Sequence, residues 1–276
     1  MIHPRLFTSL ILLDPVIARQ DPEGDREVSS IAKLSALRKD LWQSREEAAT
    51  WFAKSKFYAR WDPRVLDRWL WHGLRDVPTK LYPKLADGDS RVTLKTPKHQ
   101  EVFTFVRPNI VISSRVNNIA ALDAFTQDET PSKAGAPVRP EVQQVFDQMV
   151  YMQPSVLFIY GSESNFTRPS GRDELVARTG TGIGGNGGKA AGRVEDVLLD
   201  GVGHLVAMEA VHQCADTITA FLGRNLMRWS NEEENFRHMW SSRSSTEKTT
   251  VSNQWLNVLD QAAQVNEAKR TTRSKL

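Results

Sequence analysis

Three short runs of apolar, β-forming residues set the first limits on the fold of this chain. They lie at residues 7–13, 155–160 and 193–199. The first two are continuous apolar runs ended by turn residues, which is typical of strands buried on both faces in a parallel sheet. Because helix-like sequence separates the runs, we expect an α/β fold built on about three core strands.

The segment after the first run carries strong helix-start signals. Ser44 and Glu47 have the spacing of a capping box, in which each side chain bonds to the other residue's free backbone amide. Asp62 followed by Pro63 is a second start signal, and Gly73 is the expected end of that helix. We therefore predict a helical block inserted after the first strand.

The predicted organisation is an interrupted core with a large insertion. Residues 1–17 and 151–225 are expected to form the core, and residues 18–150 a large, mainly helical lid. Five of the eight Trp lie between positions 42 and 71. Packing between helices would explain them, and so would the lining of an apolar substrate tunnel. A last core helix is expected to end at Gly223, and a polar extension to follow over 226–276.

Composition argues against several classes of function. The net charge is only +3 and is spread along the chain, without the basic, aromatic-rich stripe of a nucleic-acid-binding surface. No run of 18 apolar residues exists, so no membrane span is expected. Six scattered His and one Cys, Cys214, give no metal-ligand spacing, and we expect neither a metal nor another cofactor.

A glycine-rich segment invites a nucleotide-binding interpretation, which its context does not favour. Gly180, Gly182 and Gly185 fit G-x-G-x-x-G, but they follow a polar stretch instead of a strand. A phosphate-binding P-loop would need Gly and Ser or Thr where Ile183 and Ala190 stand. We interpret the segment as a flexible loop beside the active site.

Two residues that follow predicted strands are candidates for acid–base chemistry. His204 lies in a glycine-rich turn after the third run, and Asp14 ends the first. Carboxyl ends of parallel strands share one rim of a sheet, so Asp14 could orient the His204 imidazole. Glu163, after the second run, is the alternative acid. A histidine bonded to backbone and a simple Asp-Pro turn are the structural alternatives. The sequence contains no G-x-S-x-G nucleophile motif.

The chain ends in a tripeptide that is a targeting signal. Ser274, Lys275 and Leu276 form the address that the peroxisomal import receptor reads, at the end of a polar tail. We therefore predict a peroxisomal location.

Several segments together resemble the α/β-hydrolases. Residues 3–7 and 10–16 are similar to the family's segment after the nucleophile helix, and residues 201–209 to its histidine loop. Residues 61–68 and 179–182 resemble a fungal subgroup, which includes the yeast peroxisomal lipase and abhydrolases of AK-toxin-type clusters. The resemblance covers about residues 1–225.

This resemblance implies an ester or thioester hydrolase, or an acyl transferase, of fungal lipid or toxin (secondary metabolite) biosynthesis. Its substrate would be an apolar acyl compound. His204 would be the general base and Asp14 the acid, because the family's more usual acid position falls at Ser164; Glu163 stays the alternative.

The family's nucleophile precedes the strand at residues 7–13. The chain therefore resembles an N-terminally truncated member with an unpaired strand edge. A catalytically silent product or a peroxisomal binding protein is the alternative function.

Overall fold

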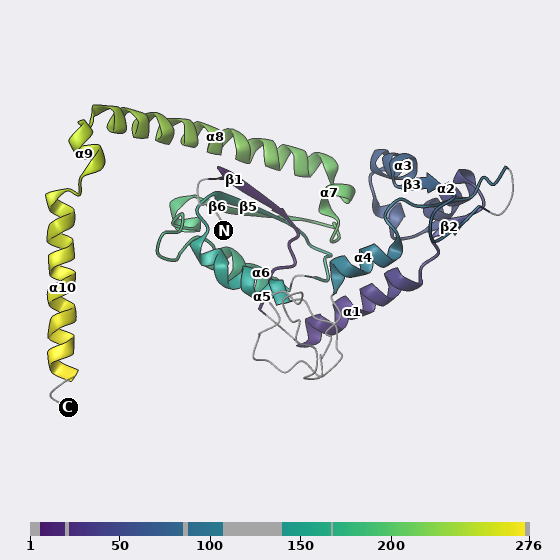
Figure 1. Ribbon diagram of the computed structural model, residues 1–276. Coiled ribbons are helices and arrows are strands. Elements are labelled where there is room, and N and C mark those ends of the chain that lie inside the picture. The colour runs from purple at the N-terminus through teal and green to yellow at the C-terminus, as the bar shows by residue number, and fades with distance from the viewer. Residues whose placement is uncertain (1–5, 20–21, 85–87, 107–139, 167, 274–276) are drawn as a thin grey trace. The chain divides into compact units, whose positions relative to one another are not determined.

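The computed structural model describes residues 6–19, 22–84, 88–106, 140–166 and 168–273 (Figure 1). The chain is divided into two compact units, Met1–Leu222 and Gly223–Leu276. The first contains the sheet and the predicted acid–base residues. The predicted targeting tripeptide Ser274–Leu276 lies outside the described residues.

The core of the first unit is a parallel sheet of the order β1-β5-β6, formed by β1 (Ser9–Leu13), β5 (Ser155–Gly161) and β6 (Val194–Leu199). This confirms the expected α/β class and its three core strands. All seven residues of β5 are buried, because strands flank it on both sides. The prediction of full burial is wrong for β1, which is only half-buried. Among the described residues it pairs with β5 alone and so lies at an edge.

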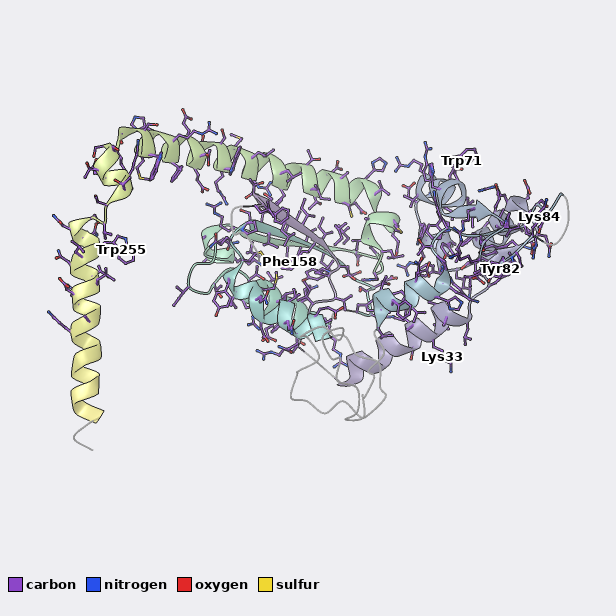
Figure 2. All side chains as sticks on the ribbon, in the orientation of Figure 1. Lys33, Trp71, Tyr82, Lys84, Phe158 and Trp255 are labelled. Carbon is purple, nitrogen blue, oxygen red and sulfur yellow. The ribbon has the colours of Figure 1, made fainter. Side chains whose placement is uncertain are left out.

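Alternate residues of β5 face two different clusters of apolar side chains. Phe158, labelled in Figure 2, lies on the face of the sheet that is covered by α5 (Pro140–Gln148) and α6 (Pro169–Arg178). Ile159 lies on the opposite face, which is covered by α7 (Val206–Glu209) and the first part of α8 (Val211–Ser242). Helices thus cover both faces of the sheet. Since α5 packs on the sheet, this part of the predicted lid segment lies in the core.

A cap lies between the core strands β1 and β5 in the sequence. Its described residues, 22–84 and 88–106, form eight elements. It is mainly helical, as expected, but also contains a small antiparallel sheet of the order β2-β4-β3. Its elements are α1 (Pro22–Leu37), β2 (Leu41–Trp42), α2 (Arg45–Lys54), η1 (Tyr58–Arg60), α3 (Pro63–His72), β3 (Leu74–Asp76), β4 (Val92–Leu94) and α4 (Lys98–Phe105).

The predicted helix starts of the cap are present in the structure, but only one half of the capping box predicted for Ser44 and Glu47 forms. The Ser44 hydroxyl accepts a bond from the Glu47 amide at the start of α2, and the Glu47 carboxylate accepts one from the amide of Gln43. Asp62 caps α3 by accepting from the amide of Arg64, and Gly73 ends that helix. These local interactions fix helix ends whatever packs around them.

Aromatic side chains form the centre of the cap. Trp42 and Phe52 are each 1% exposed, and the Phe52 and Tyr58 rings lie 4.6 Å apart. Leu205 and Met208, which come from the core, pack against this aromatic cluster. Packing therefore explains most of the Trp stripe, whereas Trp71, labelled in Figure 2, is 72% exposed.

The glycine-rich segment is not a flexible loop beside the active site, so that interpretation is wrong. Its amides donate to carbonyls of the chain that leads into β5, with Gly180 bonded to Met149, and Asn186 to Met152, each at 2.8 Å. These carbonyls precede β5, so the segment lies at the amino ends of the strands. Asp14 and His204 follow the carboxyl ends. The 3-10 turns η4 (Met149–Tyr151) and η5 (Lys189–Ala191) flank these contacts.

The prediction that a helix ends at Gly223 is also wrong. Helix α8 continues through Gly223 to Ser242, followed by α9 (Ser245–Thr249) and α10 (Asn253–Arg273). The extension is therefore helical, not merely polar. Among the helices that the structure describes, none combines the length and apolar character needed to cross a bilayer.

The glycine segment gives a test of this packing. A Cβ added at Gly185 would lie 2.3 Å from the Gly180 carbonyl oxygen, whereas one at Gly171, within α6, would meet nothing within 4 Å. We expect Gly185→Ala to lower the free energy of unfolding by about 1–3 kcal/mol. Gly171→Ala, the control, should be neutral or stabilising by up to about 1 kcal/mol. Equal stabilities in urea unfolding would contradict this account of the loop.

Candidate active site

Asp14 lies at the carboxyl end of β1 with its carboxylate buried. The residue is 1% exposed and has a left-handed backbone with φ of 43°, which aspartate tolerates better than most residues. Its amide donates to the Ile159 carbonyl at 2.7 Å, so it is still tied to β5. Its Oδ1 accepts a long bond of 3.4 Å from the Gly161 amide. The carboxylate is thus fixed where β1 and β5 end.

His204 lies in the loop between β6 and α7 and contacts this carboxylate. Its Nδ1 is 2.6 Å from Asp14 Oδ2. A carboxylate accepts hydrogen bonds, so we assign the proton of the neutral imidazole to Nδ1, which leaves the lone pair on Nε2. The His204 side chain is 32% exposed, so the imidazole is only partly covered. The pair has the geometry in which an aspartate orients a general base.

Glycine at position 161 lets the loop that carries His204, the histidine loop Gly201–Leu205, approach the end of β5. A Cβ there would lie 2.2 Å from the Gly203 carbonyl oxygen and 2.4 Å from that of Val202. The Glu163 amide donates to the Val202 carbonyl at 2.9 Å, and the Ser162 hydroxyl accepts from the Gly201 amide at 2.8 Å. The loop is therefore laid directly on the turn after β5, which brings His204 to Asp14.

The turn after β5 also supports both members of the pair. The Ser164 hydroxyl donates a short hydrogen bond to Asp14 Oδ2. The Phe166 ring lies 4.2 Å from the His204 ring, centroid to centroid. Sequence reasoning weighed Ser164 only as an acid and missed Phe166. The one available signal was their position directly after a buried strand.

Glu163, the alternative acid, is engaged elsewhere. Its carboxylate forms an ion pair with Arg60 of the cap at 2.8 Å and is 54% exposed. The structure thus brings His204 to Asp14, and Glu163 to a cap residue.

A tyrosine on the central strand lies near the Asp14 charge. Burial, with the nearby Asp14 charge as the next cause, raises the pKa of Tyr160 on β5, so this phenol stays neutral. Within the described part of the chain, no group of three His, Cys, Asp or Glu is placed to hold a metal ion.

Comparison with known proteins begins with sequence relatives, since no family model matches the chain. The type I acyl-CoA thioesterase mpaH of Penicillium brevicompactum is 32% identical over 290 residues, covering 100% of this chain and 65% of that protein. Its counterpart from Penicillium roqueforti is 32% identical and is covered to 62%. The chain therefore spans just under two thirds of these relatives. The abhydrolase domain-containing protein ACTT2-1 of Alternaria alternata is 25% identical and is covered to 89%.

Among solved structures, the peroxisomal α/β-hydrolase Lpx1 of Saccharomyces cerevisiae is similar to this chain. The TM-score is 0.52 at 14% identity, covering 91% of this chain and 59% of that one. At this identity the likeness shows the fold alone.

NMR in solution can show whether Asp14 or Glu163 is the carboxylate bonded to His204. We expect the His204 Nδ1 proton to give a far-downfield NMR resonance, because it is bonded to a buried carboxylate. Asp14→Asn should abolish this signal or shift it upfield, because the carboxamide of asparagine is uncharged. Asparagine is chosen because it tolerates the left-handed backbone conformation of position 14. Glu163→Gln should retain the signal. The reverse pattern would assign the partner of His204 to Glu163.

Proposed function

We propose that this protein of the α/β-hydrolase fold, whose relatives include fungal abhydrolase-domain proteins, uses His204 and Asp14 as the base and acid of a serine-type acyl hydrolase. The observation that carries the proposal is the 2.6 Å contact between His204 Nδ1 and the buried Asp14 carboxylate. His204 Nε2 would take the proton of a hydroxyl nucleophile and return it to the leaving group. Asp14 would hold the ring and stabilise the imidazolium between these steps.

The nucleophile of this reaction class sits on a G-x-S-x-G turn, a motif that these 276 residues do not contain. The chain spans 65% and 62% of the two thioesterase relatives, so the proposal concerns the role of the pair in the whole protein. The edge position of β1 supports it. A nucleophile-bearing strand added in parallel beside β1 would end on the same rim as Asp14.

We propose an apolar acyl ester or thioester as the substrate, with acyl transfer as a variant of the same chemistry. The Penicillium relatives are named acyl-CoA thioesterases, which supports a thioester. The aromatic cluster of the cap packs against Leu205, the neighbour of His204, and the Phe166 ring covers the imidazole. An apolar acyl chain would find complementary surface there. The resemblance of the sequence to the fungal subgroup supports lipid or toxin biosynthesis.

We further propose that the protein acts in peroxisomes, where the import receptor would bind Ser274–Leu276. The terminal tripeptide supports this location, and so does the peroxisomal name of the structural neighbour Lpx1.

Kinetics test the proposed chemistry, and they require a protein in which this chain is joined to a G-x-S-x-G turn. With acyl-CoA and p-nitrophenyl esters of increasing chain length, His204→Ala should lower kcat by about 10³-fold or more. Asp14→Asn should lower it by about 10³–10⁴-fold. Asp76→Asn is the control, since this exposed carboxylate pairs with Arg45 in the cap. Unchanged kcat in both the His204 and Asp14 variants would contradict the roles proposed for the pair. Absence of turnover and of any serine labelled by a fluorophosphonate would favour a catalytically silent binding protein.

The location is tested independently. A fluorescent protein fused upstream of the chain should colocalise with a peroxisomal marker in fungal cells. Deletion of Leu276 should disperse it, because the receptor reads the complete tripeptide. A diffuse signal from both fusions would contradict peroxisomal import.

A further inference from the structure

We propose that Arg60 of the cap and Glu209 of the core form a latch that holds the histidine loop, Gly201–Leu205, in place. Both would be positioning residues for His204. This inference rests on the base role proposed for His204. Arg60 and Glu209 belong neither to the acid–base pair nor to the residues described above as supporting it, Ser164 and Phe166.

Arg60 is held firmly by its neighbours in the cap. It ends η1, between Tyr58 and Trp61, which are 5% and 7% exposed and belong to the aromatic cluster. Because those two rings are packed, the backbone of Arg60 follows any movement of the cap. The guanidinium itself points to the core.

The guanidinium contacts three core segments at once. Its Nη1 pairs with Glu163 at 2.8 Å, its Nη2 donates to the Gly201 carbonyl at 3.1 Å, and its Nε donates to Glu209 at 2.9 Å. These segments follow β5, β6 and the histidine loop. The hydrogen bonds to Glu163 and then Glu209 raise the pKa of Arg60, so the charge is permanent. A planar fork of donors suits such a junction, and the single ammonium of lysine does not.

Glu209 connects this fork to the residue beside the histidine. Its side chain is 10% exposed, and its Oε2 accepts from the Gly203 amide at 2.9 Å as well as from Arg60. A Cβ at Gly203 would lie 2.7 Å from Glu209 Oε1, so glycine permits the close approach. The carboxylate therefore bridges the cap and the backbone next to His204.

The latch makes the position of the imidazole depend on the cap. Bonds between charged groups are stronger and more directional than neutral ones, so Arg60 restrains Glu209, and Glu209 restrains Gly203. If this restraint is lost, the loop gains freedom and the His204 bond to Asp14 loses alignment. Arg64 offers a matched comparison, because its Nη2 also reaches the core, 3.0 Å from His212 Nε2. Its other hydrogen bonds and ion pairs among the described residues go to Asp62 and not to the histidine loop.

The experiment compares Arg60→Met with Arg64→Met in the isotope-labelled chain. Two readouts report the latch: the hydrogen-exchange rate of the Gly203 amide and the His204 Nδ1 proton resonance. In Arg60→Met the exchange should be about tenfold faster, and the resonance broadened or lost. In Arg64→Met both should stay within about twofold of the wild type. Wild-type values in Arg60→Met, or equal changes in both variants, would overturn the proposal.

Near-UV circular dichroism of the aromatic cluster reports whether each variant keeps a folded cap. If Arg60→Met loses that signal, Glu209→Gln replaces it, because the amide keeps an oxygen acceptor but not the charge. Gly203 exchange about threefold faster or more supports the latch, and an unchanged rate overturns it. Neither readout needs a nucleophile, so failure of hydrolysis would count against the proposed function and leave the latch standing.

Discussion

The buried carboxylate of Asp14 is the constraint around which the rim of the sheet is organised. A carboxylate that is 1% exposed must be compensated by hydrogen bonds, since an unpaired buried charge is strongly destabilising. The compensation comes from the Gly161 amide, the Ser164 hydroxyl and the His204 imidazole. These groups come from the last residue of β5, the turn after β5 and the loop after β6. Strand pairing brings the ends of β1, β5 and β6 to one rim, and the need to compensate the Asp14 anion draws these groups together there and orients the imidazole.

Around this centre, the cap and the core share an interface of two kinds. Leu205 and Met208 extend the aromatic cluster of the cap into the core. Beside them, Arg60 and Asp62 reach the core through polar groups, including a bond of 2.8 Å from the Asp62 amide to the Met208 carbonyl. Apolar burial supplies non-directional attraction, whereas the polar contacts fix one relative position. The cap is thus tied to the core in both ways next to His204.

The sequence predicted those features that depend on local or periodic patterns. The three strands and the helix caps at Ser44 and Asp62 follow from short-range rules. The common rim of Asp14 and His204 follows from the rule that the carboxyl ends of parallel strands lie at one edge of a sheet. The features it missed depend on partners far along the chain. The glycine segment is fixed by carbonyls about thirty residues earlier, and Arg60 meets Glu209 across 149 positions. Helix α8 passes through Gly223 although glycine in a helix interior costs about 1 kcal/mol relative to alanine, so the residue alone was a weak signal for a helix end.

A double-mutant cycle on the rim tests the central claim, that Asp14 and His204 act as one hydrogen-bonded pair. The free energies of unfolding would be measured at neutral pH for the wild type, Asp14→Asn, His204→Gln and the double variant. A bond between an imidazole and a buried carboxylate predicts a coupling energy of about 1.5–3 kcal/mol. Additive effects, with a coupling below about 0.5 kcal/mol, would mean that the two side chains do not interact, and would contradict the account.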